Sequence, residues 1–487
     1  MKKLLFAFAP LALAACSTTP PETPQDDAGA DVDIRPPTPP EWDRDVTRPS
    51  DTAATADRAA CKFKSGSMPA ETLGTSMPVD KDIPIENIVV VMMENHSFDN
   101  YFAGFAKYTG RIDVEVPPPN AANPEKTGAT PGASIPLVHA PHLCTLDPNH
   151  EWSGTHLQYD DGKMDGFVES NEGWGGASPL AKGDRSMITY DERDIPFYYG
   201  LAKTFALADH YHASILGPTW PNRMFLISGT SFGLTFNGFP DLSTFVYPDK
   251  DASLLDELEK RHVSWNLYGA GTTGVAVVYN VAFLSRWGRP VKLVDTDFIA
   301  AAKGGTLPQV SILDPHIGSE GATQNDEHPP ADIQFGQKFV ADIVDAITKG
   351  PQWAHTALFI TWDEHGGYYD HLAPPPACKP DGNAPRLEQG DITPGDFDRY
   401  GVRVPLIVVS PYAKPGYVGH STYDHTSILR FIQTKFKVPA LTGRDANADP
   451  LMDMFDFSSP KSLNPGALPE AKIDAAEQAY CTTTYAK

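Results

Sequence analysis

Short apolar runs alternate along this chain with longer segments in which apolar residues recur every three to four positions. The runs are typical of buried strands. They cover residues 89–93, 262–269, 356–362 and 402–411. The helical patterns begin at Ser253, Asp332 and His425, and the second of them continues to Gly350. Strands that alternate with helices predict a largely parallel sheet covered by helices on both faces, so the expected fold class is α/β.

Polar side chains follow two of these apolar runs directly. Glu94, Asn95 and His96 follow the first run. Asp363 and Glu364 follow the third. Parallel sheets bind their ligands at the carboxyl ends of strands, which is where these residues fall. An unpaired carboxylate beside a buried strand end costs several kcal/mol, so Glu94 is expected to have a partner there. Asp363 and Glu364 are equally compatible with a solvated strand end.

A third polar group lies in GPTWPNRMFLISGT, residues 217–230. Gly217 and Pro218 predict a turn, and Thr219 falls at the start of the helix that follows. A hydroxyl at a helix N-terminus faces unpaired backbone N–H groups and the positive end of the helix dipole, which favours phosphate binding. An ordinary helix cap is the other interpretation of Thr219. Arg223, one turn later, is expected either to bind phosphate oxygens or to cover the sheet edge.

The first residues have the pattern of an export signal. Residues 1–15 combine two lysines with an apolar stretch that is too short to cross a membrane. The ending L-A-A-C resembles the lipobox of bacterial lipoproteins, which predicts a membrane anchor through a lipid on Cys16; a plain secretory signal is the alternative. Residues 16–60, dense in Pro, Thr and Asp, predict a disordered tether, and residues 61–487 predict a folded domain. The expected location is the bacterial cell envelope, at the periplasm or outer membrane.

The chain is strongly acidic and contains few cysteines. Its formal charge of −23 becomes −25 once the two lysines of the signal are removed. Such a chain is not expected to attract nucleic acid or an anionic membrane surface. Four cysteines remain after Cys16, namely Cys61, Cys144, Cys378 and Cys481. In an oxidising compartment they predict two disulfides with all three pairings open, and their spacing is unlike that of a structural zinc site.

Several segments of the chain resemble one known family. They are IENIVVVMMENHSFDNYF, DPNHEW, GKMDGF, GPTWPNR, NDEHPP, WDEHGGYYDH, RVPLIVVSPYAKPG and YDHTSILRFI, and all lie between residues 85 and 433. In these segments the chain is similar to the bacterial phosphoesterases that include phosphatidylcholine-cleaving phospholipases C and a group of acid phosphatases, within the alkaline phosphatase superfamily. The resemblance implies a three-layer αβα sandwich, alkaline phosphatase-like, with a mostly parallel central sheet and insertions. It also implies a metal-dependent phosphoester hydrolase.

The resemblance further implies a set of metal ligands. They fall on Glu94, Asn95, Asp363 and Glu364, and the nucleophilic hydroxyl, itself a ligand, falls on Thr219. All of these are oxygen ligands, which suit one hard divalent cation such as Ca²⁺, Mg²⁺ or Mn²⁺ better than zinc. The cation would activate the Thr219 hydroxyl for attack on phosphorus, and a covalent phosphothreonine would form.

Two histidines complete the expected site. The active-site histidines of the family fall on His150 and His328, and either is suited to donate a proton to the leaving alkoxide. The acid phosphatases of this group differ, because they carry serine as the nucleophile and a pair of adjacent histidines in mid-chain. Residues 265–268 of this chain, at the comparable place, read WNLY. The chain therefore looks more like the phospholipase side of the family.

The expected function is an exported phospholipase C-like enzyme, with phosphatidylcholine as the leading substrate. Two alternatives stay open. One is an acid phosphatase that acts on small soluble phosphomonoesters, and the other is a lipoprotein that binds a phosphorylated ligand without turning it over. Tyr101, Trp220 and Tyr368 lie near the motifs and are candidates to face a quaternary ammonium group. The sequence leaves the oligomeric state open.

Overall fold

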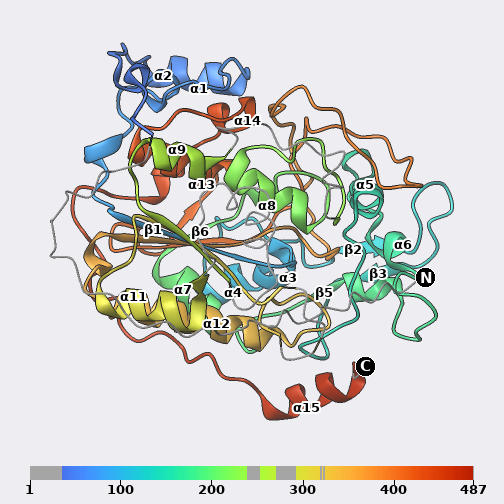
Figure 1. Cartoon of the computed structure of the whole chain (residues 1–487). Coiled ribbons are helices and arrows are strands. Elements are labelled where there is room, and N and C mark those ends of the chain that lie inside the picture. The colour runs from blue at the N-terminus through green and yellow to red at the C-terminus, as the bar shows by residue number, and fades with distance from the viewer. Residues whose placement is uncertain (1–35, 239–252, 270–291, 318–320, 322–323, 486–487) are drawn as a thin grey trace, which may run out of the picture. The chain divides into compact units, whose positions relative to one another are not determined.

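The computed structural model describes residues 36–485 apart from residues 239–252, 270–291, 318–320 and 322–323 (Figure 1). The predicted signal peptide and the lipid anchor at Cys16 therefore lie outside the described residues. The sheet, its helices and the candidate site all belong to one compact unit, Pro37–Lys487.

An eight-stranded sheet forms the centre of this unit. In spatial order its strands are β13 (Tyr417–Gly419), β6 (Ala206–Ala208), β12 (Leu406–Val409), β11 (Thr356–Trp362), β1 (Asn87–Met93), β10 (Val310–Asp314), β8 (Trp265–Gly269) and β9 (Lys292–Leu293). Among these described strands, β12 runs antiparallel to both of its neighbours and the remaining pairs are parallel. The predicted α/β class and the mostly parallel sheet are confirmed.

The two central strands bring their carboxyl ends to the same point. β1 and β11 pair in parallel along their full length, with Met93 beside Trp362 at the end. Every residue of both strands is buried, as expected for continuous apolar runs in a parallel sheet. Glu94 and Asp363 are the next residues on the two strands, and the Asp363 N–H donates to the Met93 carbonyl oxygen. The strand register thus makes neighbours of two polar segments that are far apart in the sequence.

Helices cover both faces of the sheet and give three layers (Figure 1). On one face lie α8 (Thr219–Ser228), α9 (Leu254–Lys260) and α13 (His425–Phe436), which contact one another. On the other face lie α7 (Pro196–Thr204), α11 (Ile299–Gly304) and α12 (Ile333–Thr348). The predicted three-layer αβα sandwich is therefore confirmed.

The helix starts predicted from the sequence are capped in the structure. The Ser253 side chain accepts from the Asp256 N–H ahead of α9, and the Asp332 side chain accepts from the Gln334 N–H ahead of α12. Such bonds satisfy backbone donors that a helix leaves without a partner at its N-terminus. α12 then ends two residues before Gly350, close to the predicted end.

The remaining elements are short. The helices are α1 (Asp51–Ala59), α2 (Pro69–Thr72), α3 (Phe98–Phe102), α4 (Phe105–Thr109), α5 (Trp152–Tyr159), α6 (Phe167–Asn171), α14 (Gly443–Asn447) and α15 (Ala475–Thr484). The strands are β2 (Ala122–Pro124), β3 (Ser134–Pro136), β4 (Val138–His139), β5 (Ile188–Thr189), β7 (Tyr211–His212) and β14 (Tyr423–Asp424). Figure 1 shows α5, α6, β2 and β3 together on the right, beyond α3, which follows β1. Among the described helices, none has the length and apolar character that crossing a bilayer requires.

Two disulfides tie the ends of the described chain to its body. They join Cys61 to Cys378 and Cys144 to Cys481, across sequence separations of 317 and 337 residues. The prediction of two disulfides is confirmed, and the structure selects one of the three pairings. The first bridge anchors the segment that follows α1, and the second anchors α15.

The predicted disordered tether is wrong for residues 40–59. Residues 40–43 form a 3₁₀ helix, and α1 follows from Asp51. Trp42 is buried, with the side-chain cations of Lys260 and Arg261 over its ring. The prolines of this segment do not prevent packing, because a proline at the first turn of a helix removes no hydrogen bond that the helix would make. A single aromatic anchor was therefore overlooked in a segment of otherwise polar composition.

Candidate active site

The chain reverses sharply where β1 ends. Asn95 and His96 both have positive φ, 65° and 80°, a left-handed backbone that asparagine tolerates better than most residues. The turn directs the Asn95 N–H toward Asp363, whose Oδ1 accepts it at 3.1 Å. The two ring nitrogens of His96 lie 2.7 Å from Asn100 Oδ1 and 3.0 Å from the Glu327 carbonyl oxygen. His96 is therefore a structural residue that holds the turn in place.

Two glycines follow the carboxylates at the end of β11. Gly366 and Gly367 have φ values of 63° and 72°, and a Cβ atom on Gly366 would lie 2.6 Å from the Cβ of Asn95. Only glycine allows this close approach, so the turn after Glu364 packs directly against the turn after β1. The Gly366 N–H also donates to Glu364 Oε2 at 2.8 Å and fixes that carboxylate.

Thr219 is the first residue of α8 and is 1% exposed. Its hydroxyl donates to Glu94 Oε1 at 3.2 Å, and Asn237 Nδ2 lies 3.5 Å from the Thr219 Oγ1 atom. These described contacts are with side chains and not with the backbone N–H groups of α8, so the helix-cap interpretation is not supported. The N-terminus of α8 thus brings a hydroxyl, with the N–H groups of the first turn nearby, to the end of β1.

Three oxygens of the predicted metal ligands lack a hydrogen-bond partner among the described residues. They are Glu94 Oε2, Asn95 Oδ1 and Glu364 Oε1, and all three side chains are buried. A buried oxygen without a donor is costly. Carboxylate and amide oxygens, together with a hydroxyl, are the ligands that hard divalent cations prefer. By chemical type, this set of oxygens therefore suits a Ca²⁺, Mg²⁺ or Mn²⁺ ion.

Asp363 differs from the other predicted ligands because both of its carboxylate oxygens accept hydrogen bonds. Oδ1 accepts from the N–H groups of Asn95 and Glu364, and Oδ2 accepts from Arg223 Nε at 2.8 Å. Each carboxylate oxygen has more than one lone pair, so these bonds leave capacity for a cation. Asp363 lies with the other predicted ligands and also holds together the turns that end β1 and β11.

Two carboxyl groups at this point, those of Glu94 and Glu364, have raised pKa values. Burial raises the pKa of Glu94, and the neighbouring Asp363 carboxylate adds to the rise, against the opposing charges of His328 and Arg223. Burial, with Asp363, also raises the pKa of Glu364 to about 8. Both directions follow from like charges that are held out of water. A bound cation would offset them.

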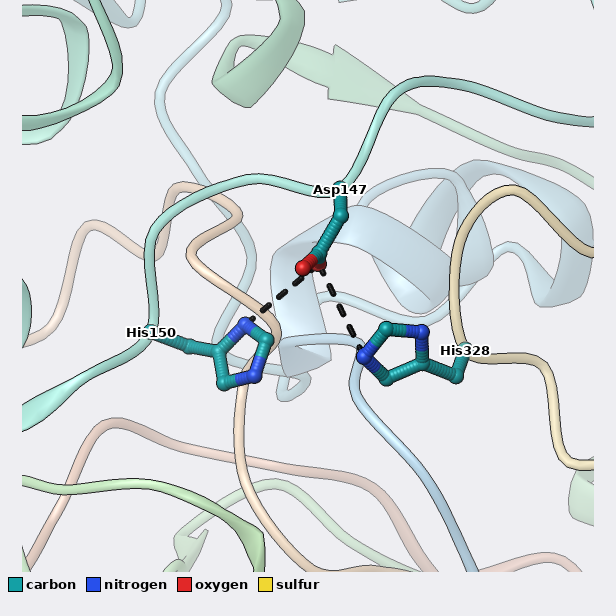
Figure 2. A group of neighbouring side chains, drawn as sticks. All are labelled: Asp147, His150 and His328. Atoms are coloured by element: carbon teal, nitrogen blue, oxygen red, sulfur yellow. Dashed lines mark ion pairs between the residues drawn. The ribbon is translucent and has the colours of Figure 1, made fainter. Parts of the chain in front are cut away.

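Two histidines from different loops lie beside one carboxylate (Figure 2). His150 Nδ1 and His328 Nε2 are 3.5 and 3.8 Å from the same oxygen of Asp147, and the two rings are edge to face with centroids 5.7 Å apart. The Nδ1 atoms lie 3.0 Å from the Pro148 carbonyl oxygen and 2.6 Å from the Pro329 carbonyl oxygen. Each histidine therefore donates through Nδ1, which leaves Nε2 for another partner.

Both histidines have raised pKa values. Burial alone would lower the pKa of His150, but the carboxylates of Glu364 and Asp147 outweigh it and raise the pKa to about 10. Burial also opposes the charged form of His328, and Asp147 and Glu94 raise its pKa to about 9. The Glu94 N–H donates to the Asp326 carbonyl oxygen and the His328 N–H donates to Asp326 Oδ1, both at 3.0 Å, so His328 is a neighbour of the predicted metal ligands.

Sequence reasoning missed two further acids of the site, Asp147 and Asp326. Asp147 opens the DPNHEW motif three residues before His150, and Asp326 precedes His328 by two residues. The Asp326 carbonyl oxygen accepts from the Glu94 N–H at 3.0 Å, and burial followed by the Glu94 charge raises the pKa of its carboxyl group well above the usual range. Both acids lie in the quoted motifs, a few residues before a histidine. Their spacing in the sequence does not show which of the loop carboxylates faces an imidazole ring.

The Arg223 side chain forms its hydrogen bonds with other residues of the chain. Its guanidinium is 1% exposed and donates to the carboxylates of Asp363 and Asp314 and to the carbonyl oxygens of Met92 and Met93. The structure supports neither of the two roles that the sequence suggested for it. Arg223 instead links α8 to the ends of β1, β10 and β11, and so places Thr219 relative to the carboxylates.

Two of the aromatic residues considered for ammonium binding belong to the core. Tyr101 and Tyr368 are fully buried and stack on His96, with ring centroids 4.3 and 5.0 Å from the centroid of the imidazole. They support the turn after β1. Trp220 differs, since it lies beside Thr219 and is only partly buried.

The chain is similar to a known family over most of its length. The sequence model of the Phosphoesterase family matches residues 85–439. Non-specific phospholipase C6 of Arabidopsis thaliana is 32% identical over 418 residues, which cover 80% of this chain and 75% of that protein. Phospholipase C A of Mycobacterium tuberculosis is 32% identical over 448 residues, which cover 79% of this chain and 81% of that protein. Non-hemolytic phospholipase C of Burkholderia pseudomallei is 31% identical over 436 residues, with 77% and 59% covered.

Solved structures of similar fold are more distant in sequence. A protein in the alkaline phosphatase superfamily from Vibrio parahaemolyticus is 10% identical, with 82% of this chain and 78% of that chain covered and a TM-score of 0.38. The lipoteichoic acid synthase LtaP from Listeria monocytogenes is 9% identical, with 88% and 96% covered and a TM-score of 0.38.

Replacing Arg223 with methionine should destabilise the fold by about 3–5 kcal/mol, because Asp363 and Asp314 would stay buried without their cation. Urea-induced unfolding followed by circular dichroism measures the loss. Arg193→Met is the matched control, since Arg193 pairs with Asp191 at an exposed position and its loss should leave the unfolding midpoint nearly unchanged. A midpoint shift no larger in Arg223→Met than in Arg193→Met would contradict the role assigned to Arg223.

Proposed function

Because this chain belongs to the Phosphoesterase family, and is therefore a hydrolase of phosphoester bonds, we propose that it is a phospholipase C-like phosphodiesterase with Thr219 as its nucleophile. The observation that carries the proposal is the Thr219 hydroxyl, which lies at the N-terminus of α8 and donates to Glu94 Oε1. A side-chain oxygen oriented in this way by a neighbouring carboxylate suits nucleophilic attack. The relatives that are named phospholipases C support the choice of a diester.

The reaction proceeds in two steps. Thr219 Oγ1 attacks phosphorus, a phosphothreonine ester forms, and the bond between phosphorus and the alcohol of the substrate breaks. Glu94 Oε1, to which the hydroxyl donates, accepts its proton as a lone pair of Oγ1 bonds to phosphorus. The N–H groups and the dipole of the first turn of α8 stabilise the negative charge on the phosphate oxygens. In the second step a water molecule attacks phosphorus and gives a proton to His328, which lost one to the leaving alkoxide. The bond between phosphorus and Oγ1 breaks, Thr219 regains its proton from Glu94, and the phosphorylated headgroup leaves.

We assign the proton of the leaving alkoxide to His328. The side chain of His328 is 27% exposed, against 5% for His150, so His328 is the histidine that an entering substrate can reach. Its Nδ1 is engaged with the Pro329 carbonyl oxygen, which leaves the Nε2 proton for the substrate. His150 stays in the interior, where its positive charge balances Glu364.

One divalent metal ion would be held by Glu94, Asn95, Asp363, Glu364 and the Thr219 hydroxyl. Three of these side chains contribute buried oxygens that have no other described partner. When bound, the ion would neutralise phosphate charge and lower the pKa of the threonine hydroxyl. Ca²⁺, Mg²⁺ and Mn²⁺ all suit this oxygen set.

We further propose that the protein is exported to the cell envelope and attached to a membrane through Cys16. The two disulfides support an oxidising compartment, because such bonds are rare where thiols are kept reduced. The L-A-A-C pattern at residues 13–16 supports the attachment.

Thr219→Val should lower turnover by about a thousandfold or more, because valine keeps the β-branched shape but has no attacking oxygen. Thr219→Ser is the matched control, since it keeps a hydroxyl at the N-terminus of α8 and should retain most of the activity. Initial rates on p-nitrophenyl phosphorylcholine measure both variants. Activity of Thr219→Val within a few-fold of that of Thr219→Ser would show that Thr219 is not the nucleophile.

Glu94→Gln should reduce the bound divalent metal to well below one ion per chain, because an amide keeps an oxygen but loses the charge. Metal content by mass spectrometry is the readout, and it does not depend on activity. Glu86→Gln is the control, since Glu86 is exposed just before the opposite end of β1. Equal metal content in the two variants would contradict the proposed ligand set.

Phosphatidylcholine should be cleaved faster than p-nitrophenyl phosphate at matched concentrations, because the proposed substrate is a diester. Glycerophosphocholine, assayed in parallel, separates a preference for diesters from a preference for lipids. A rate on the monoester that exceeds both diester rates by about tenfold or more would favour a phosphatase acting on soluble monoesters instead.

A further inference from the structure

The loop at residues 173–181 is ordered and carries two exposed apolar side chains. Its ends meet through a hydrogen bond from the Gly173 N–H to the Ala181 carbonyl oxygen at 2.9 Å. Trp174 and Leu180 are 38% and 40% exposed. Single exposed apolar residues are common on protein surfaces. Several large ones close together more often mark a site that binds a protein or a membrane.

The turn at residues 388–393 is a second feature of the same kind. The Asp391 N–H donates to the Glu388 carbonyl oxygen at 3.0 Å, and the Thr393 N–H donates to Asp391 Oδ1 at 2.8 Å. These bonds fix the backbone of the turn, which displays Ile392 with 90% of its surface exposed.

Both features are attached to the segment that carries His150. The Asn149 N–H donates to Asn171 Oδ1 at 2.6 Å, two residues before the first loop begins. Trp152 Nε1 donates to the Thr393 carbonyl oxygen at 3.2 Å, at the end of the turn. The loop and the turn therefore flank the histidine side of the active site.

A cavity of about 400 Å³ lies where the two features come together. Its lining includes Glu151, Trp152, Trp174, Glu388, Asp391 and Ile392. Phe236 lines it as well, and the next residue, Asn237, lies 3.5 Å from the Thr219 hydroxyl oxygen. Trp174 and Ile392 thus line one cavity, and the residue that follows Phe236 in its wall contacts the proposed nucleophile.

Resting on the proposed function, we propose that Trp174 and Ile392 form a docking rim that inserts into the surface of a zwitterionic phospholipid bilayer. The rim would bring the mouth of the site into contact with the lipid headgroups. Large apolar and aromatic side chains beside polar ones are suited to the boundary between headgroups and acyl chains.

Charge identifies the kind of membrane. Glu151, Glu388 and Asp391 line the cavity that the rim surrounds. The outermost groups of a phosphatidylcholine layer are cationic ammonium groups, which these carboxylates attract, whereas an anionic layer would be repelled by them and by the acidic chain as a whole. The rim therefore fits a zwitterionic surface and not an anionic one.

Ile112 provides a matched control for Ile392. It is fully exposed, and its neighbour Arg111 donates to the Gly416 carbonyl oxygen just before the edge strand β13. Four strand spacings separate β13 from β1 in the sheet, a distance of about 19 Å. A change of Ile112 therefore removes the same apolar surface far from the active site.

Vesicle binding tests the docking rim directly. Each variant is combined with Thr219→Val in the full chain, so that lipid is not consumed, and binding to vesicles of pure phosphatidylcholine is measured by co-flotation. Ile392→Ser and Trp174→Ser should each weaken binding by about tenfold, because each removes a large apolar side chain from the contact. Ile112→Ser should bind as the parent does, and vesicles of pure phosphatidylglycerol should bind the parent more weakly.

The proposal is overturned if Ile392→Ser binds phosphatidylcholine vesicles as tightly as Ile112→Ser, or if the parent prefers phosphatidylglycerol. It is also overturned if Ile392→Ser alters only self-association in analytical ultracentrifugation, since a second copy of the chain would then cover the rim. In the active enzyme, Ile392→Ser should lower the rate on vesicles about tenfold relative to the rate on soluble p-nitrophenyl phosphorylcholine. Failure of the parent enzyme on that soluble diester would count against the proposed function, whereas vesicle binding of the Thr219→Val forms reports on docking alone.

Discussion

The burial of several carboxylates at the end of two neighbouring strands is the constraint on which the rest of the site depends. Glu94, Asp363 and Glu364 are all shielded from water, and burial together with the Asp363 carboxylate raises the pKa values of Glu94 and Glu364. A protein tolerates such a group only where opposite charge is supplied nearby. The positions of Arg223, His150 and His328 follow from this requirement, because each brings a positive charge to the cluster from a different part of the chain.

The requirement also explains how the proposed nucleophile reaches its position. Thr219 and Arg223 lie one turn apart on α8, and Arg223 donates to Asp363, Asp314 and two carbonyl oxygens at the ends of the strands. An ion pair formed at such burial leaves the helix little freedom to shift along the sheet. The same contacts that neutralise the carboxylates therefore set the distance between the threonine hydroxyl and Glu94. Structure and proposed chemistry rely on one set of interactions.

The elements that sequence reasoning predicted correctly were those with local signals. Continuous apolar runs identified β1, β11 and β12, and capping residues identified the starts of α9 and α12. Glu94 and Asp363 could be expected to meet because the register of parallel strands aligns their ends. Contacts between distant segments carried no such signal. Burial of Trp42 against the body, the pairing of Arg223 with Asp314 and the placement of Asp147 beside both histidines depend on packing that composition and spacing do not encode.

The direction of β12 has a consequence for how the site can vary. Because β12 runs antiparallel to β11, with Leu406 beside Thr361, the connection between these strands leaves the sheet and returns to it at the catalytic edge. A connection between parallel strands must run from one end of the sheet back to the other, whereas this connection begins and ends at the same edge. Residues 363–405 therefore form an extended hairpin loop that begins with Asp363, Glu364 and the glycine turn, and the length of its later part can change without any shift in strand order or register. Insertions and deletions in that later part would remodel the entrance to the site while the carboxylates beneath it keep their positions.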